Sequence, residues 1–194
     1  MSRNITATTS IGALSHNLWQ VRQAAPRALI WSVVKANAYG HGLLAAMVGF
    51  DQADGLALLE FEGAVALREA GWSRPILMLE GAFAPADVDL ASRLGLTLVV
   101  HHQEQVSWLE AARGTPMPVF LKINTGLNRL GVAAGVARIT HERLRRCPMV
   151  SSTGLMTHFA NADLPEGAAA PLRRFDAATE GLTGARTVAN SARC

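Results

Sequence analysis

Short apolar runs alternate with longer amphipathic segments along the whole chain. The longer segments carry apolar side chains three or four residues apart, the spacing of a helix buried on one face. The apolar runs predict strands at 27–35, 55–60, 75–80, 96–101, 117–124, 152–159 and 185–191. The segments between them predict helices at about 11–25, 40–49, 61–71, 84–95, 103–114, 135–146 and 170–180, the first with Ser10 as its N-cap.

Strands that alternate with helices predict a parallel sheet with helical crossovers, and therefore the α/β fold class. The strands are apolar throughout, which is typical of burial on both faces. One candidate architecture is an open doubly wound sheet; the other is a (β/α)8 TIM-like barrel, which takes about 250 residues. The chain has 194 residues and stops just after its seventh predicted strand. It therefore fits a small seven-stranded domain or a barrel truncated before its last strand, in either case one domain over 1–194.

Composition argues against nucleic-acid and membrane partners. The chain is 49% hydrophobic and 17% charged, with a formal net charge of +3. Its basic residues are scattered, and the dense cluster at 142–146 fits a solvated helix face, so we expect no nucleic-acid partner. Cys147 and Cys194 lack the spacing of a metal site or a disulfide framework, which favours a cytoplasmic location. No apolar leader or membrane span is visible, and no membrane partner is expected.

Chemically capable side chains gather where the strands are predicted to end. They are Lys35, Tyr39, Glu80, His101, His102, Lys122, Arg129, His158, Asn190 and Ser191. The carboxyl ends of parallel strands meet at one edge of a sheet, where α/β proteins place their ligands. The set is rich in cations and poor in carboxylates. It suits an anionic small molecule such as a phosphate ester, and we expect no metal.

Lys35 is the most informative of these residues, because an apolar run rarely ends in a lone ammonium. Desolvation lowers the pKa of a lysine and makes its amine a good nucleophile for a carbonyl. The competing interpretation is a lysine that reaches from the strand end to water. Tyr39, directly before Gly40 at the start of the next predicted helix, fits either a phosphate-binding hydroxyl or a turn residue. A histidine such as His158 is more often structural than catalytic.

Four motifs resemble those of one family. The stretch "VVKANAYGHG" (33–42) is similar to the cofactor-attachment motif of alanine racemases, the fold-type-III pyridoxal-phosphate enzymes. The stretches "KINTGLNRLGV" (122–132), "MTHFANAD" (156–163) and "ANSA" (189–192) resemble further motifs in the same order. The resemblance extends from about residue 5 to residue 192. It implies an incomplete barrel that lacks the family's last strand and C-terminal β domain.

The resemblance implies a role for each matching residue. Lys35 would form the Schiff base with pyridoxal 5′-phosphate and act as one of two catalytic bases. Tyr39 and Ser191 would bind the cofactor phosphate. The implied reaction is the interconversion of L-alanine and D-alanine, either to supply D-alanine for peptidoglycan or to degrade alanine.

The other matching positions surround the cofactor in the family. Lys122 matches a lysine that many members carbamylate and that braces the arginine matched by Arg129. That arginine contacts the cofactor's phenolic oxygen, and we place Arg129 in the substrate site as well. His158 matches a histidine beside the pyridine ring, and Asn190 an asparagine in contact with the site.

The parts of the family's enzymes that this sequence lacks imply that it is not active alone. In the family, a tyrosine from the C-terminal domain of a partner subunit is the second base, so the complete enzyme is expected to be a homodimer. We therefore expect the 194-residue chain alone to be inactive. Three other interpretations compete with this one. They are a non-racemising pyridoxal-phosphate-binding protein, a fold-type-III decarboxylase, and an α/β domain that binds a phosphorylated metabolite.

Overall fold

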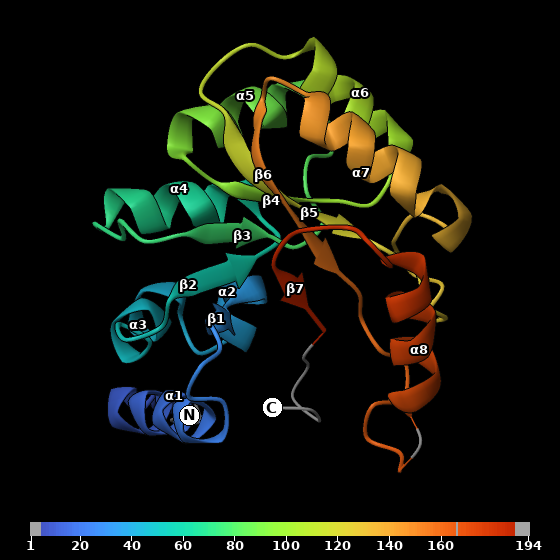
Figure 1. Ribbon diagram of the computed structural model, residues 1–194. Helices are drawn as coiled ribbons and strands as arrows, with labels where there is room; N and C mark the ends of the chain where they lie inside the picture. Colours follow the sequence, from blue (N-terminus) through green and yellow to red (C-terminus); the bar gives the residue numbers. More distant parts are fainter. Residues whose placement is uncertain (1–4, 166, 189–194) are drawn as a thin grey trace. The chain divides into compact units, whose positions relative to one another are not determined.

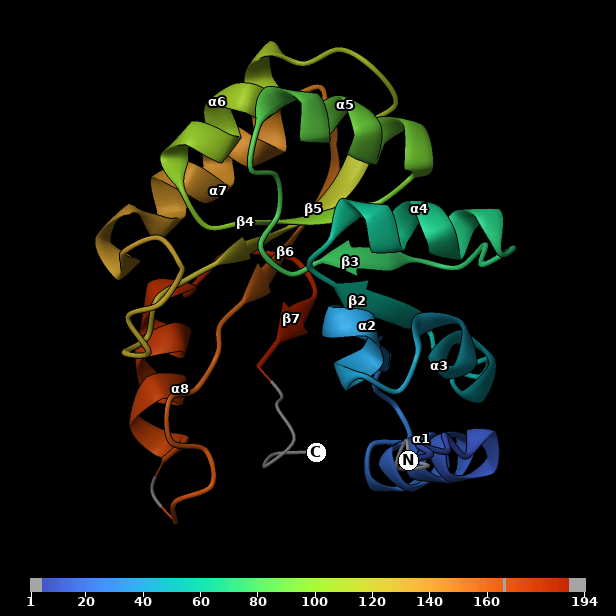
Figure 2. The same cartoon turned by 180° about the vertical axis from the view of Figure 1, so that it is seen from behind.

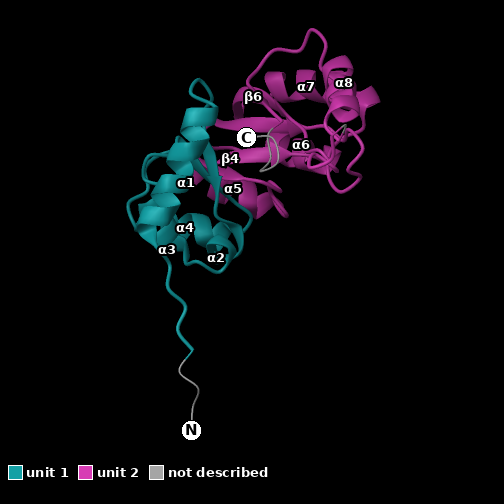
Figure 3. Cartoon of the chain, turned by 90° about the horizontal axis from the view of Figure 1, so that it is seen from below, with its two compact units in different colours: residues 1–74 teal, residues 75–194 magenta. Residues whose placement is uncertain are grey.

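The computed structural model describes residues 5–165 and 167–188. Contacts within the chain divide it into two compact units, Met1–Arg74 and Pro75–Cys194 (Figure 3). The expectation of one domain over the whole chain stays a prediction.

The first unit builds a two-stranded parallel ladder with its helices. Its elements are α1 (Ile11–Ala24), β1 (Trp31–Val33), α2 (Lys35–Tyr39), α3 (Leu43–Gly49), β2 (Gly55–Leu58) and α4 (Phe61–Glu69) (Figure 1). Trp31 pairs with Gly55, and the ladder runs on in parallel from there. Ser10 begins α1 as expected, since its Oγ accepts a hydrogen bond from the Ala13 N–H at 3.2 Å.

The burial of the two strands differs. Every residue of β2 is buried, as the apolar run predicts. The expectation of a buried strand is wrong for β1, whose Trp31 and Ser32 are half-buried and whose Val33 is 39% exposed. Within the described residues of this unit, β1 pairs along one edge with β2, so it lacks the second neighbour that would cover it.

Asp54 joins α1 to the start of β1. Its Oδ2 accepts hydrogen bonds from the Ile30 N–H at 2.7 Å and from Arg22 Nη2 at 2.5 Å. Arg22 also donates to the Ala28 carbonyl at 2.7 Å. Burial alone would raise the pKa of Asp54, but the hydrogen bonds from Ile30 and Arg22 and the charge of Arg22 together hold it below its ordinary value.

Replacing Asp54 with asparagine should therefore make the protein less stable at neutral pH, by about 1 kcal/mol, because a partly exposed charged hydrogen bond is lost. The folded pKa lies below the unfolded one, so this contribution is present above the unfolded pKa of about 4 and is lost as the pH falls through the folded pKa. Urea unfolding at neutral and at acidic pH measures it. A difference between wild type and Asp54→Asn that persisted at about pH 2 would contradict the assignment.

The second unit continues the alternation. Its elements are β3 (Ile76–Met78), α5 (Pro85–Leu94), β4 (Thr97–Val100), α6 (Gln103–Ala111), β5 (Met117–Lys122), the 3-10 helix η1 (Ala134–Val136), α7 (Ala137–Arg146), β6 (Val150–Met156), α8 (Ala169–Ala178) and β7 (Arg186–Thr187). Strands β3 to β7 are neighbours in chain order, and all are parallel. An unbroken order is typical of a (β/α) barrel, whereas a doubly wound sheet reverses its order at a switch point.

Helices α5, α6 and α7 lie side by side over one face of this sheet (Figures 1 and 2). The strands beneath them are lined by fully buried apolar side chains, among them Ile76, Met78, Leu98 and Leu121. These side chains form the core of the unit and hold the strand ends in place. Within the part of the chain that the structure describes, every helix is too short or too polar to cross a lipid bilayer.

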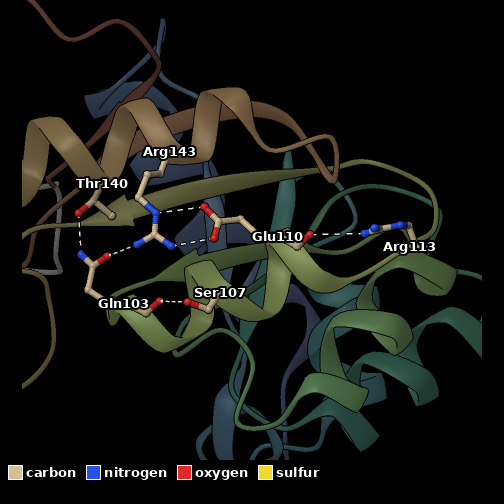
Figure 4. A network of polar contacts seen from close by, with 6 residues as sticks. All are labelled: Gln103, Ser107, Glu110, Arg113, Thr140 and Arg143. Atoms are coloured by element: carbon tan, nitrogen blue, oxygen red, sulfur yellow. Dashed lines mark hydrogen bonds and ion pairs between the residues drawn. The ribbon is translucent and has the colours of Figure 1, made fainter.

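A polar network joins α6 to α7 on the outside of the unit (Figure 4). Arg143 binds both carboxylate oxygens of Glu110, at 3.0 and 2.7 Å, and donates to Gln103 Oε1 at 2.8 Å. Gln103 in turn donates to Thr140 Oγ1 at 2.7 Å. The hydrogen bond from Arg143 lowers the pKa of Glu110. Because Arg143 and Glu110 are partly exposed, their ion pair fixes the spacing of two helices more than it stabilises them.

Candidate functional site

Lys35 lies two residues beyond the end of β1, at the head of α2. This short helix is left-handed: Ala36, Asn37, Ala38 and Tyr39 have φ angles of +51°, +53°, +54° and +54°. Lys35 itself is half-buried, so its burial alone does not choose between a desolvated amine and a lysine that reaches water. The expectation that the first strand ends at Lys35 is wrong by two residues, because β1 ends at Val33, and the turn that follows has the opposite hand to an ordinary helix.

A left-handed turn of non-glycine residues is costly, at about 1–2 kcal/mol per residue. Hydrogen bonds on both sides hold it in place. The Ala38 N–H donates to Val34 O at 2.9 Å, the Gly42 N–H donates to Asn37 O at 3.0 Å, and Asn37 Oδ1 accepts from the Leu43 N–H at 2.8 Å. Backbone strain that the surroundings maintain in this way is concentrated at functional sites.

The turn brings Lys35 and Tyr39 together. They are four residues apart, and Lys35 Nζ lies 5.9 Å from the centroid of the Tyr39 ring. The ring is 61% exposed, so its hydroxyl is open to a ligand. The expectation that Tyr39 begins a helix is wrong, because the left-handed turn occupies these residues and α3 begins only at Leu43.

Sequence reasoning missed Glu60 in this unit. Its Oε1 accepts a hydrogen bond from the Ala36 N–H at 3.2 Å, directly after Lys35. Glu60 is the N-cap residue of α4, two residues beyond β2, so a carboxylate 24 residues away in the sequence helps to hold the turn. The one sign of Glu60 in the sequence is that it follows an apolar run. Glu80 also follows an apolar run, but it does not hold the turn after Lys35.

Lys122, Arg129 and His158 come from the ends of two neighbouring strands of the second unit. Lys122 is the last residue of β5 and only 6% exposed. His158 is half-buried and follows β6, which pairs with β5 up to Met156. Arg129 is exposed on the loop that leaves β5. The prediction that these three residues lie near the carboxyl ends of the strands is confirmed, and their roles stay predictions.

The loop that carries Arg129 is tightly organised. The Val132 N–H donates to Lys122 O and the Asn124 N–H to Val132 O, each at 2.9 Å, which closes the loop on itself. Inside it, Asn124 Oδ1 accepts from the N–H groups of Gly126 and Asn128 at 3.0 and 3.2 Å. These hydrogen bonds therefore fix the backbone of the loop that carries Arg129.

His101 is held more firmly than the sequence suggested. Its Nε2 lies 3.0 Å from the Glu80 carbonyl oxygen. Burial lowers the pKa of His101, and the charges of Lys122 and His102 lower it further, against opposing effects of the Glu80 carbonyl and carboxylate. His102 has a structural task, since its Nδ1 accepts from the Glu104 N–H at 3.3 Å and caps α6.

Gln105, which sequence reasoning missed, ties this corner together. It is 5% exposed, and its Nε2 donates to the carbonyls of Glu80 and Ala82 at 3.0 and 2.9 Å. Its Oε1 accepts from the N–H groups of His101 and His102 at 2.8 and 3.3 Å. A signal existed, because a polar residue followed three positions later by glutamine is the pattern of a capping box. Asn190 and Ser191, also predicted to serve the site, lie outside the described residues.

Comparisons with known proteins agree with this arrangement. A family model described as "Alanine racemase, N-terminal domain" matches residues 9–194. The alanine racemase of Polaromonas naphthalenivorans is 50% identical over 194 residues, which are 99% of this chain and 53% of that protein. The chain thus spans about half the length of the curated relatives it matches.

Solved structures confirm the fold class. The biosynthetic alanine racemase from Pseudomonas aeruginosa matches with a TM-score of 0.88 and 37% identity, over 94% of this chain and 52% of that one. The match confirms the expected α/β fold, with seven parallel strands of a truncated TIM-like barrel. A histidine racemase from Leuconostoc mesenteroides matches with a TM-score of 0.83 over 95% of this chain and 52% of that one, and its 24% identity supports the fold alone.

Proposed function

The chain belongs to the alanine racemase N-terminal domain family, and on that premise we propose that it is the cofactor-binding part of a pyridoxal-phosphate-dependent racemase that interconverts L-alanine and D-alanine. The observation that carries the proposal is the pairing of Lys35 with Tyr39 across the left-handed turn. The turn places an amine and an exposed phenol at a fixed separation. A ligand that has both an aldehyde and a phosphate could use both groups at once.

The residues fit pyridoxal 5′-phosphate by their chemistry. The amine of Lys35 is the group that condenses with an aldehyde, and the Tyr39 hydroxyl would donate to the phosphate. On the second unit, we assign Arg129 and His158 to the cofactor ring, Arg129 also to the substrate, and Lys122 to bracing Arg129, whether or not Lys122 is carbamylated. When bound, the cofactor supplies an electron sink that makes the substrate Cα–H acidic. Asn190 and Ser191 keep their proposed roles from the sequence.

Lys35 would also move a proton. Its amine, when free, would take the proton from the substrate Cα or return it on one face. Inversion needs a second base on the opposite face, and the family resemblance assigns that base to a tyrosine of a partner subunit. The homodimer, the inactivity of this chain alone, and the supply of D-alanine for peptidoglycan therefore stay predictions.

The first test is a loss of cofactor binding at Lys35. Adding pyridoxal phosphate to the purified chain should produce absorbance at about 420 nm, and Lys35→Ala should abolish it. The sequence has only two lysines, Lys35 and Lys122, so Lys122→Arg is the matched control. Borohydride reduction followed by peptide mass spectrometry should find the label on Lys35. An unchanged band in Lys35→Ala, or a label on Lys122 alone, would overturn the assignment.

A chiral assay separates the reaction classes. The complete protein that contains this chain, incubated with L-alanine, should yield D-alanine. Release of carbon dioxide instead would identify a decarboxylase. Cofactor binding with neither product would leave a non-racemising binding protein.

A further inference from the structure

Helix α8 holds the loop that carries Arg129 from outside. Arg174 of α8 donates from Nη1 to the Thr125 carbonyl oxygen at 3.0 Å, across 49 residues of sequence. Figures 1 and 2 both show α8 beside the loop that leaves β5. Phe175, the next residue of the helix, is fully buried, so the helix that carries Arg174 is anchored in the core. The guanidinium therefore reaches the loop from a fixed element.

Thr125 is also held from inside. Thr157 Oγ1 donates to the Ile123 carbonyl oxygen at 2.9 Å. A hydroxyl has one proton, so Thr125 Oγ1 must be the donor in its 2.7 Å hydrogen bond with Thr157 Oγ1. Both threonines are only 3% exposed. Since Thr157 directly precedes His158, this buried pair joins the loop of Arg129 to the strand end that carries His158.

The peptide group between Thr125 and Gly126 is held at both of its polar atoms. Its carbonyl oxygen accepts from Arg174, and its N–H donates to Asn124 Oδ1 at 3.0 Å. These two atoms belong to one planar unit and point in opposite directions. The two hydrogen bonds, one from α8 and one from within the loop, therefore select a single orientation of that unit.

The glycine in this peptide group makes the restraint necessary. Gly126 has a φ of +125°, a region that is open to glycine but strained for other residues. A Cβ atom at this position would lie 2.8 Å from Arg174 Nη1, so the guanidinium packs directly against the glycine. Without that contact, the peptide group can rotate at little cost. Its N–H would then leave Asn124, whose Oδ1 also holds the Asn128 N–H. Arg129, the next residue, would lose its fixed position.

We propose that Arg174 is a positioning residue for Arg129. It acts through the peptide group that follows Thr125 rather than by direct contact with a ligand. The proposal rests on the proposed function, which assigns Arg129 to the cofactor ring and to the substrate. Loss of the Arg174 side chain should leave the strands intact and release the loop, so that Arg129 holds the cofactor less firmly.

Hydrogen exchange followed by mass spectrometry measures the loop without any cofactor. In the complete protein that contains this chain, Arg174→Ala should speed amide exchange over residues 124–128 about fivefold, because the peptide group that orders the loop is released. The amides of β6, which lies in the same unit, should exchange at the wild-type rate. Arg174→Lys keeps a charged donor and should fall between wild type and Arg174→Ala.

Arg173 provides the matched control. It is exposed on the same helix, one residue earlier, and carries the same charge. Among the described residues, the hydrogen bond from α8 to Thr125 comes from Arg174 and not from Arg173. Arg173→Ala should therefore leave both loop exchange and cofactor affinity unchanged. An equal effect of the two alanine variants would point to the lost charge rather than to the Thr125 hydrogen bond, and it would overturn the proposal.

Cofactor affinity shows whether Arg174 acts through Arg129. Arg174→Ala should weaken the binding of pyridoxal phosphate about fivefold, since one partly exposed charged hydrogen bond is lost. The same substitution in an Arg129→Ala background should have little further effect, because the residue that it positions is already gone. A general structural role would weaken binding equally in both backgrounds, and that result overturns the proposal.

Failure of the proposed function would look different. If wild type and all variants fail to bind pyridoxal phosphate while Arg174→Ala still loosens the loop, the proposed function is refuted and the restraint of the loop by Arg174 stands. If wild type binds the cofactor, the proposed function survives. In that case an Arg174→Ala protein with wild-type affinity, whether or not its loop is looser, overturns the role of Arg174.

Discussion

Replacing Gln105 with leucine should lower the free energy of unfolding by about 3–5 kcal/mol, although leucine is of similar size. Gln105 is buried and uses both amide hydrogens and its carbonyl oxygen on backbone groups. Leucine would leave the carbonyls of Glu80 and Ala82 and the N–H of His101 without these partners. Each buried polar group that is left without a hydrogen bond costs about 1–3 kcal/mol, and partial access to water reduces the total. Urea unfolding followed by circular dichroism measures the loss.

Two further variants isolate the cause. Gln103→Leu changes a half-buried glutamine in the same helix. The amide of Gln103 forms hydrogen bonds with side chains rather than with the backbone, so the variant should lose about 1 kcal/mol of stability or less. Gln105→Glu keeps the acceptor for His101 N–H but turns a buried carboxylate toward the carbonyls of Glu80 and Ala82, so it should be at least as destabilising as Gln105→Leu. If the two leucine variants were equally stable, the hydrogen bonds of Gln105 to the backbone of Glu80, Ala82 and His101 would not be what stabilises this corner.

Asn37→Val should cost the protein about 2–4 kcal/mol. Asn37 has a φ of +53°, a region that β-branched residues almost never occupy. Valine also removes the Oδ1 that accepts from the Leu43 N–H at 2.8 Å and begins α3. The cost therefore combines backbone strain with the loss of a cap. Cofactor absorbance should weaken in parallel, because Lys35 and Tyr39 are held by the same turn.

Asn37→Gly separates the two contributions. Glycine loses the same cap but adopts a positive φ freely, so its stability should stay within about 1 kcal/mol of wild type. Thermal unfolding of the two variants gives the comparison. An equal loss in both would mean that the cap, and not the left-handed backbone, dominates.

The sequence predicted the alternation of elements well, because apolar periodicity reflects burial, and burial is what the sheet requires. Ser10 and the buried run of β2 are examples in which local chemistry and tertiary structure agree. Lys35 and Tyr39 were found because a lysine after an apolar run is unusual and because Tyr39 is the one tyrosine of the sequence, directly before Gly40.

The hand of the turn between them was out of reach. "KANAY" contains two alanines, the best formers of a right-handed helix, and nothing local opposes that hand. Contacts from elsewhere, such as the Glu60 carboxylate on the Ala36 N–H, decide it. Gln105 was missed for a similar reason, since its value lies in four backbone groups that only the fold brings together. Burial of β1 was overestimated because an apolar run does not reveal how many neighbours a strand has.

The left-handed turn also has a consequence for how the protein folds. In the unfolded chain, residues 35–39 favour the opposite hand, so the native turn gains nothing from local preference and must wait for Glu60 at the start of α4. Contacts that form after the rate-limiting step affect the rate of unfolding more than the rate of folding. We therefore expect the segment that holds this lysine to complete its structure late in folding, after its neighbours have formed.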